Sequence, residues 1–161
     1  KEGFLMHIMK KKFVIILFSF ILFSCSKDNE IKLKCGYSEE ICSALENLDK
    51  NKKKWLNSDI SSYSMSLRFS CYCLAYDPYS IIVLENNLES VSGNENWEYG
   101  NWPMTVNDIF EKLEEKIIED PFSFEIKYNS IYGYPEESYF DMVEMIADEE
   151  IGYYITNFLP L

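Results

Sequence analysis

The chain has 161 residues, a mass of 19.0 kDa and a formal net charge of -12, from 15 Lys and Arg against 27 Asp and Glu. Its single histidine, His7, lies in residues 1–24, which we predict below to be a cleaved signal. Without it, the chain has no imidazole for a catalytic triad, a His-containing zinc site or a histidine general base. Four lysines and one acid also lie in 1–24, so the remainder carries 11 basic and 26 acidic residues, a net charge of −15. This charge argues against a nucleic-acid partner, whose phosphates need a Lys- and Arg-rich surface.

The N-terminus has the pattern of a secretory signal. Three lysines, Lys10 to Lys12, precede the apolar run 13–23, and the small or polar residues Ser24, Cys25 and Ser26 follow it. A basic region, a short apolar region and small residues in this order are typical of such signals. The run is shorter than the about 20 apolar residues of a membrane span. The lysines before it and the polar chain after it disfavour the alternative, a buried core helix.

Within this signal, Leu22-Phe23-Ser24-Cys25 resembles the lipobox of bacterial lipoproteins, in which the cysteine is acylated and becomes the first residue. We therefore expect a signal peptide over residues 1–24, with translation starting at Met9 or Met6 and any earlier residues an upstream extension. A lipidated tether over 25–37 follows, and the anchored lipid contributes about 0.8 kcal/mol per buried methylene. The tether resembles those of outer-membrane or surface-exposed lipoproteins. The expected location is extracytoplasmic, on an outer membrane or cell surface, or on the outer face of the only membrane in a single-membrane organism.

Beyond the anchor, the chain has four cysteines: Cys35, Cys42, Cys71 and Cys73. An exported compartment permits disulfides, and four cysteines allow three connectivities. Their spacing fits a zinc site poorly, and the Cys-x-Cys pair lacks the neighbours that lower a thiol pKa for redox work. We thus favour structural disulfides over free thiols, and expect no metal and no cofactor. On a regular strand Cys71 and Cys73 lie too far apart for a direct bond, so the preferred pairing joins them to Cys35 and Cys42.

Residues 38–161 are expected to form a single α+β domain that begins with a helix. Ser38-Glu39-Glu40 opens the helix, lysines at 50 and 52–54 follow, and Ser58-Asp59 ends it, an order of charges that complements the helix dipole. Its apolar stripe is formed by Ile41, Leu45, Leu48 and Trp55. A strand over 62–73 follows, because apolar residues alternate there with serines and Arg68. Asn86-Asn87 is expected to be the turn of a hairpin formed by 81–85 and 88–92.

The second half repeats this order of elements. After a loop over 93–104, Thr105 to Asp108 resemble a capping box, and the helix that they open ends at Asp120-Pro121. Its apolar stripe is formed by Ile109, Phe110, Leu113 and Ile117. One-sided strands are expected over 122–128, about 137–143 and about 151–158. Together, these elements predict an α+β fold, in which an antiparallel sheet has two helices packed on one face. The expected order is helix, three strands, helix, three strands.

Several motifs in unbroken order over residues 45–159 resemble the bacterial domain-of-unknown-function 6174 family of small, often lipid-anchored proteins. They are Trp55, Ser62-Tyr63-Ser64, Cys71-Tyr72-Cys73, Val83 in a strand, Thr105 to Phe110, Tyr128, Tyr132-Gly133-Tyr134-Pro135, Asp141, Asp148-Glu149 and Tyr154. The chain departs from the family pattern at Asn129-Ser130, where an Asp-Pro pair is expected, and at Asn86-Asn87, which replaces an Asp-Gly type of turn. The resemblance implies a fold and an anchor, and no catalytic residues.

Two groups of residues are candidate sites. The first is a cluster of carboxylates near one predicted turn: Asp141, Glu144, Asp148, Glu149 and Glu150. A Ca²⁺ loop would need alternating acids and a glycine, and that pattern is missing, so a solvated acidic turn is favoured over a cation site. The second is an aromatic surface that could stack on a sugar or on a partner's side chains: Trp97, Trp102, Tyr132, Tyr134 and Tyr139. The competing interpretation of these aromatic residues is packing at the end of a small sheet.

These observations predict a non-catalytic binding or interaction domain, held at a membrane by lipid on Cys25, that engages an envelope protein or glycan and no nucleic acid. The alternative is a hydrolase of envelope glycans that uses a carboxylate pair drawn from Asp141, Asp148 and Glu149. A third interpretation, a structural or inhibitory module, rests on fold-level analogy alone. Arg68, the sole arginine, is expected on the polar face of its strand, where it pairs with a cross-strand acid.

Overall fold

The computed structural model describes residues 35–71, 78–93, 104–146 and 148–161. The chain divides into two units, residues 1–36 and 37–161, and the helices and strands named here lie in the second. In chain order they are α3 (Glu39–Leu56), β1 (Tyr63–Ser70), β2 (Tyr79–Leu84), β3 (Asn87–Ser92), α4 (Val106–Ile118), β4 (Ser123–Tyr128), β5 (Pro135–Asp141) and β6 (Ile151–Pro160). The predicted α+β fold and its order of elements are confirmed.

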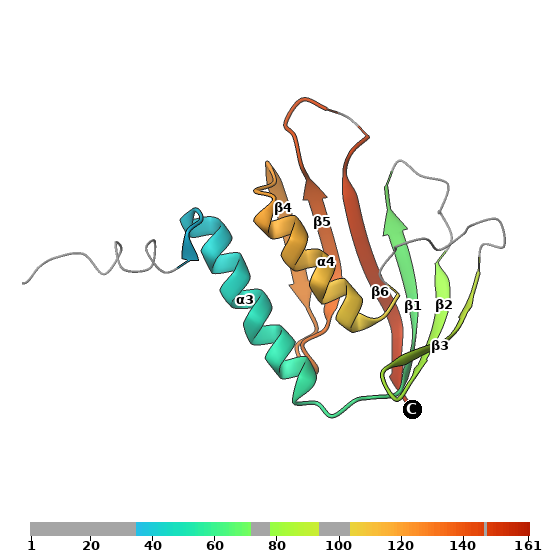
Figure 1. The fold of residues 1–161 in the computed structure, drawn as a ribbon. Helices are drawn as coiled ribbons and strands as arrows, with labels where there is room; N and C mark the ends of the chain where they lie inside the picture. Colours follow the sequence, from blue (N-terminus) through green and yellow to red (C-terminus); the bar gives the residue numbers. More distant parts are fainter. Residues whose placement is uncertain (1–34, 72–77, 94–103, 147) are drawn as a thin grey trace, which may run out of the picture. The chain divides into compact units, whose positions relative to one another are not determined.

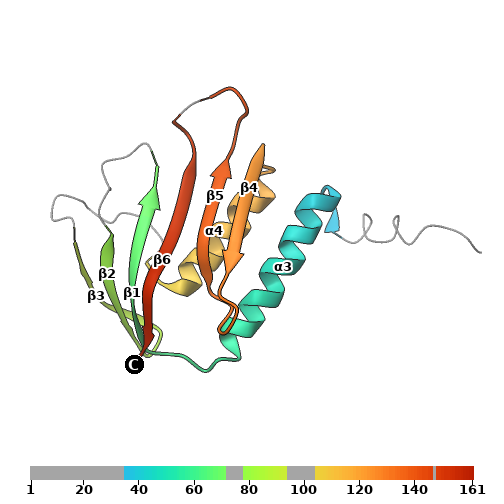
Figure 2. The same ribbon diagram turned by 180° about the vertical axis from the view of Figure 1, so that it is seen from behind.

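The six strands form one antiparallel sheet in the order β3-β2-β1-β6-β5-β4 (Figure 1). The two halves of the chain meet at its centre, where β1 pairs with β6 from Tyr63↔Pro160 to Ser70↔Gly152. β3 and β4 form the two edges, which the view from behind also shows (Figure 2). Because α4 follows β3 and precedes β4, the chain passes from one edge of the sheet to the other through this helix.

Both helices begin at side-chain caps that the sequence predicts. At α3, the Ser38 hydroxyl accepts a hydrogen bond from the Ile41 amide at 3.3 Å. At α4, Thr105 and Asp108 form a reciprocal capping box: the Thr105 hydroxyl accepts from the Asp108 amide at 3.1 Å, and the Asp108 carboxylate accepts from the Thr105 amide at 2.9 Å. These bonds satisfy amides that the first turn of a helix leaves without partners.

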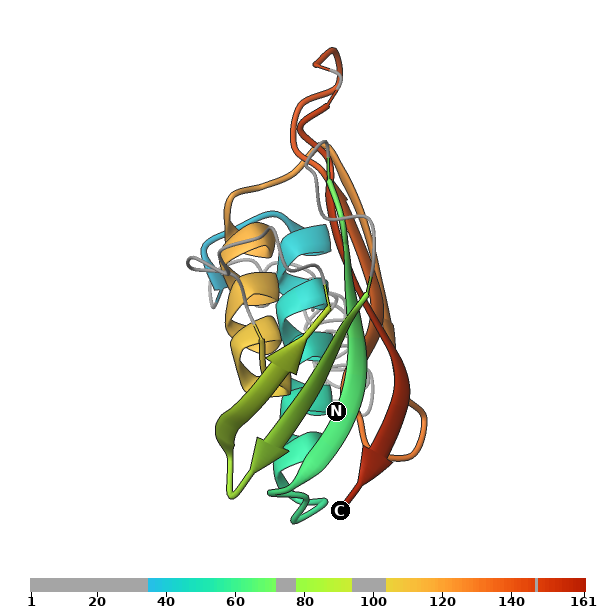
Figure 3. The same cartoon turned by 90° about the vertical axis from the view of Figure 1, so that its right-hand side faces the viewer.

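The two helices lie side by side in one layer against a single face of the sheet (Figure 3). The buried core fills the space between these layers. From β1 it takes every second residue, as the alternating pattern predicts: Tyr63, Met65, Leu67 and Phe69. From α4 it takes the predicted apolar stripe, whose members are all fully buried: Ile109, Phe110, Leu113 and Ile117. On the opposite face, β1 carries the intervening residues Ser64, Ser66, Arg68 and Ser70.

The hairpin between β2 and β3 turns one residue earlier than predicted. Its two turn residues are Glu85 and Asn86, with φ of 50° and 64°, instead of Asn86 and Asn87. Asn87 is already the first residue of β3, where it pairs with Leu84, and its side-chain amide donates to the Glu85 carbonyl at 2.9 Å. A two-residue turn that matches the twist of the strands needs positive φ at both positions. Here Glu85 accepts that conformation, so the sequence preference of Asn did not fix the position of the turn.

The disulfides differ from the preferred pairing. Cys35 is bonded to Cys42, a fully buried residue in the first turn of α3, so these two cysteines are not available to Cys71 and Cys73. Cys71 packs against the core and is also disulfide-bonded, whereas Cys73 and Cys25 lie outside the described residues.

Candidate functional site

The predicted aromatic surface is not assembled by the structure. Tyr134 is buried, and its ring stacks on Phe158 with 4.4 Å between centroids and meets Trp55 edge-on at 6.3 Å. Tyr132 is half-buried, with its ring 6.0 Å from the same Phe158. Tyr139 lies on β5 with its side chain exposed on the face of the sheet opposite the helices. Trp97 and Trp102 lie outside the described residues. The two tyrosines of the Tyr-Gly-Tyr-Pro motif therefore pack an aromatic cluster on the helix side of the sheet.

The turn between β4 and β5 fastens that hairpin to α3. The Asn129 side-chain oxygen accepts from the amides of Ile131 at 3.0 Å and Tyr132 at 2.8 Å, which closes the turn. An aspartate would offer the same acceptor, so the departure from the family pattern at this position keeps its structural role. Gly133 takes φ of 84°, and a Cβ built on it would lie 2.6 Å from the Asn51 carbonyl oxygen in α3. The turn thus contacts the C-terminal half of α3 closely.

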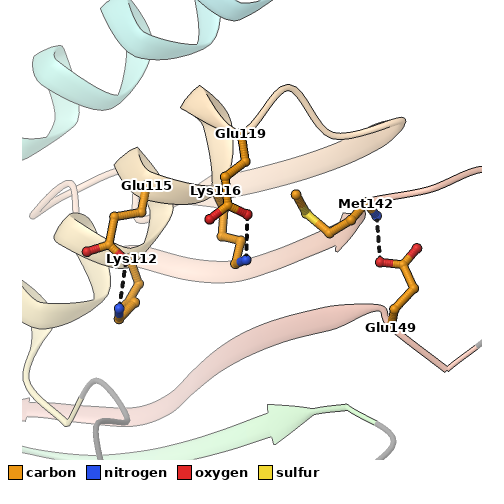
Figure 4. A network of polar contacts seen from close by, with 6 residues as sticks. All are labelled: Lys112, Glu115, Lys116, Glu119, Met142 and Glu149. Atoms are coloured by element: carbon orange, nitrogen blue, oxygen red, sulfur yellow. Dashed lines mark hydrogen bonds and ion pairs between the residues drawn. The ribbon is translucent and has the colours of Figure 1, made fainter.

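The carboxylate cluster holds its own turn together. Glu149 accepts hydrogen bonds from the amides of Met142 at 3.2 Å and Val143 at 2.7 Å, and Figure 4 shows the first of these. Glu150 accepts from the Asp148 amide at 3.1 Å. In the ranges that the structure describes, no three His, Cys, Asp or Glu residues are grouped to hold a metal ion. The carboxylates of Glu149 and Glu150 thus satisfy backbone amides, and the glycan hydrolase stays a prediction.

Arg68 lies on the open face of the sheet, where the register pairs it with Tyr154 of β6. Its guanidinium carbon is 4.1 Å from the centre of the Tyr154 ring, a cation–π geometry. Toward the β4 edge of this face, Lys127 contacts Glu137 at 2.9 Å and Glu125 at 3.5 Å. Instead of the expected acid, Arg68 thus has an aromatic neighbour.

The described surface also carries a groove between α3 and the edge strand β4, with a volume of about 670 Å³. Its floor is formed by the half-buried side chains of Phe124, Ile126 and Tyr128, which point to the helix side of β4. Its wall is formed by residues of α3: Glu40, Ser43, Ala44, Glu46, Asn47 and Lys50. We call this the α3–β4 groove.

A second hollow, of about 940 Å³, continues along the same helix and shares Lys50 with the groove. It is lined by Asp49, Lys50, Lys53, Lys54, Asn57, Ser58, Ile131 and Tyr132. Ile131 adds an exposed apolar side chain to this lining. The two hollows together follow α3 along most of its length.

Tyr128 is the most unusual residue of the groove floor. Its hydroxyl is buried and has no hydrogen-bond partner among the residues that the structure describes, and this burial raises the pKa of the phenol above its ordinary value. Its ring stacks on Phe110 of α4, with 6.4 Å between centroids. A buried hydroxyl without a partner costs free energy.

The sequence predicts the helix and the strand that line this groove, but it does not predict that they lie side by side. The alternation of Phe124, Ile126 and Tyr128 predicts a one-sided strand, and the groove follows from the position of that strand at the edge of the sheet, beside α3. Edge position is a property of the whole topology, so no local pattern carried this signal.

Within the described ranges, no helix has the length and the apolar character needed to cross a membrane. No curated protein and no solved structure matches the chain significantly. One family model, described as a family of unknown function (DUF6174), matches residues 47–160. This match covers α4, all six strands and most of α3, and the chain belongs to the DUF6174 family.

Proposed function

We propose that this chain is a lipid-anchored extracytoplasmic protein whose domain binds an envelope partner without catalysing a reaction. The anchor is supported by the sequence alone, through Lys10 to Lys12, the apolar run 13–23 and Cys25. The Cys35–Cys42 disulfide agrees with an oxidising compartment, where such bonds persist. The proposed location is the outer membrane or the cell surface, with the lipid on Cys25 as the attachment.

The mass of the intact protein, extracted from membranes of cells that express the natural chain, tests the anchor. We expect a mass equal to residues 25–161 plus acyl groups, lower by four hydrogens before reduction than after it, since two disulfides would be opened. A Cys25→Ala variant should lose the acyl mass and leave the membrane fraction. An unlipidated natural chain that keeps residues 1–24 would overturn the anchor and the location together.

The α3–β4 groove carries the binding part of the proposal. It joins an apolar floor, a polar helical wall and a buried hydroxyl without a partner, the combination of groups found where a ligand is held. The open face of the sheet is a second exposed surface and serves as the comparison. Its β1 and β2 strands carry small polar residues such as Ser66 and Ser80.

Site-specific photocrosslinking in intact cells tests this assignment. A photoreactive amino acid replaces Ser43 in the groove wall or, as the matched control, Ser80 on the open face of β2; both serines are exposed. We expect a discrete crosslinked product from position 43 and none from position 80. A product from position 80 alone would move the binding surface to the open face, and the absence of any product at both would contradict a binding role.

A further inference from the structure

We propose that the α3–β4 groove takes an extended segment of a partner protein as a seventh strand, which runs antiparallel to β4 beneath α3. This inference rests on the proposed binding function and specifies its mode. Three features of the groove support it. They are the hydrogen-bond pairing of the β4 edge, the position of α3 beside that edge, and the distribution of charge along the groove.

Among the residues that the structure describes, no strand pairs with the outer edge of β4. Its pairing there is with β5, in regular register from Ser123↔Asp141 to Lys127↔Glu137, with an irregularity between Lys127 and Tyr128. Proteins protect such edges with proline, bulges, charged side chains along the edge or charged side chains that point inward. β4 has no proline, and its two charged residues, Glu125 and Lys127, lie on the open face, while the three side chains that it turns toward the helices are aromatic or aliphatic. An antiparallel edge of this kind is a template for a further strand.

The opposite edge of the sheet is a poorer template. β3 pairs with β2 through a register shift between Ile82 and Val83, and all six of its residues are exposed or nearly so. The two hollows described above both follow α3. A strand added at β3 would therefore gain main-chain hydrogen bonds without burying its side chains, whereas one added at β4 would gain both.

The position of α3 gives the added strand a cover. In Figures 1 and 2, α3 lies beside the β4 edge of the sheet, while α4 lies over the sheet itself. Neighbouring strands lie about 4.8 Å apart, so a strand next to β4 would run below α3. Every second side chain of that strand would enter the groove between Ala44 and the apolar floor of Phe124, Ile126 and Tyr128. The remaining side chains would lie on the open face beside Glu125 and Lys127.

For a segment that runs antiparallel to β4, the charge along the groove determines the chemistry of the partner. The turn that follows β4 contacts Asn51 and Lys54, so β4 ends near the C-terminal half of α3. An antiparallel segment therefore begins beside the second hollow, where three lysines, Lys50, Lys53 and Lys54, outnumber Asp49, the ion-pair partner of Lys53. It ends beside Glu40 and Glu46. The complementary segment is acidic at its N-terminal end, apolar at alternate positions, and basic at its C-terminal end.

A second copy of this chain is a poor occupant. Two β4 strands that pair antiparallel are related by a twofold axis perpendicular to the sheet, which keeps the helices of both copies on the same face. Each α3 lies beside its own β4 edge, so both helices would need the space above the junction. The geometry thus favours a segment without such a helix at its edge.

Synthetic peptides test the mode of binding. The forward peptide has eight residues, Asp-Asp at its N-terminus, valine at alternate central positions and Lys-Lys at its C-terminus; the reversed peptide exchanges the charged ends. We expect the reversed peptide to bind residues 25–161 about threefold more weakly, as expected for exposed ion pairs. In an added strand, the backbone N–H groups of every second residue point toward β4 and the others point away. N-methylation of the residues whose N–H groups point toward β4 should weaken binding by at least about tenfold, whereas N-methylation of the others should be tolerated.

Variants of the protein locate the site. Ser43→Trp fills the groove and should weaken binding of the forward peptide by at least about tenfold, whereas Ser80→Trp on the open face should leave it unchanged. Glu40→Lys should weaken it more than Glu39→Lys, a neighbouring acid that does not line the groove. Strand addition would be overturned if Ser43→Trp and Ser80→Trp had equal effects, or if the forward peptide did not bind. It would also be overturned if the protein formed a dimer that blocked peptide binding. A crosslink from position 43 together with such a result would leave the binding function intact and refute only its mode.

Discussion

Replacing Trp55 by alanine will lower the free energy of unfolding by about 3–5 kcal/mol, the range for removing a large aromatic side chain from a core. Trp55 is 3% exposed and meets three rings edge-on: Tyr63 at 5.5 Å, Phe158 at 5.8 Å and Tyr134 at 6.3 Å. Its indole N–H also donates to the Asn107 side chain at 3.0 Å. The residue therefore joins α3 to β1, β6 and α4, and its loss leaves both a cavity and an unpaired acceptor.

Urea unfolding of the exported domain with its disulfides intact, followed by circular dichroism, measures this effect. Leu56→Ala is the control, because its side chain is 58% exposed at the next position of the same helix, and we expect a change within about 0.5 kcal/mol. Equal losses for the two variants would mean that α3 does not pack on the sheet through Trp55.

The second large effect is expected for Gly133→Ala, which will lower the free energy of unfolding by about 2–4 kcal/mol. Alanine at φ of 84° costs about 1 kcal/mol, and its Cβ would lie 2.6 Å from the Asn51 carbonyl oxygen and 2.9 Å from the Lys54 Cβ. Relief of that overlap requires the turn and α3 to separate, which adds about 1–3 kcal/mol.

Gly36 provides a matched control for the steric part. It has nearly the same φ, 83°, and a Cβ built on it meets nothing within 4 Å. Gly36→Ala should therefore cost only the conformational part, about 1 kcal/mol. Thermal unfolding of both variants measures the difference, and a Gly133→Ala variant no less stable than Gly36→Ala would contradict the close contact between the turn and α3.

The features that were predictable from the sequence are those that depend on neighbours in the chain. The Ser38 and Thr105–Asp108 caps lie within three residues of the amides that they bind, and the alternation from Tyr63 to Phe69 is visible in one strand. Such patterns fix each element by itself. They were sufficient for the fold class because two helices and six one-sided strands have few ways to bury their apolar sides.

The features that were missed depend on residues far apart in the chain. Whether Tyr134 is exposed or buried depends on Trp55 and Phe158, which come from α3 and β6. The α3–β4 groove depends in the same way on the strand order, which places β4 at an edge of the sheet. The pairing of Cys35 with Cys42 was also missed. The prediction started from the strand that contains Cys71 and Cys73, whereas the partner of Cys35 lies in the first turn of α3.

Amide hydrogen exchange of β4, with and without the forward peptide, tests most directly whether the α3–β4 groove binds an extended segment. We expect the peptide to slow exchange by at least about tenfold at alternate residues of 123–127, where amides without a partner gain one, and to leave β3 unchanged. Unchanged exchange in β4 with saturating peptide, or protection of β3 instead, would contradict this account.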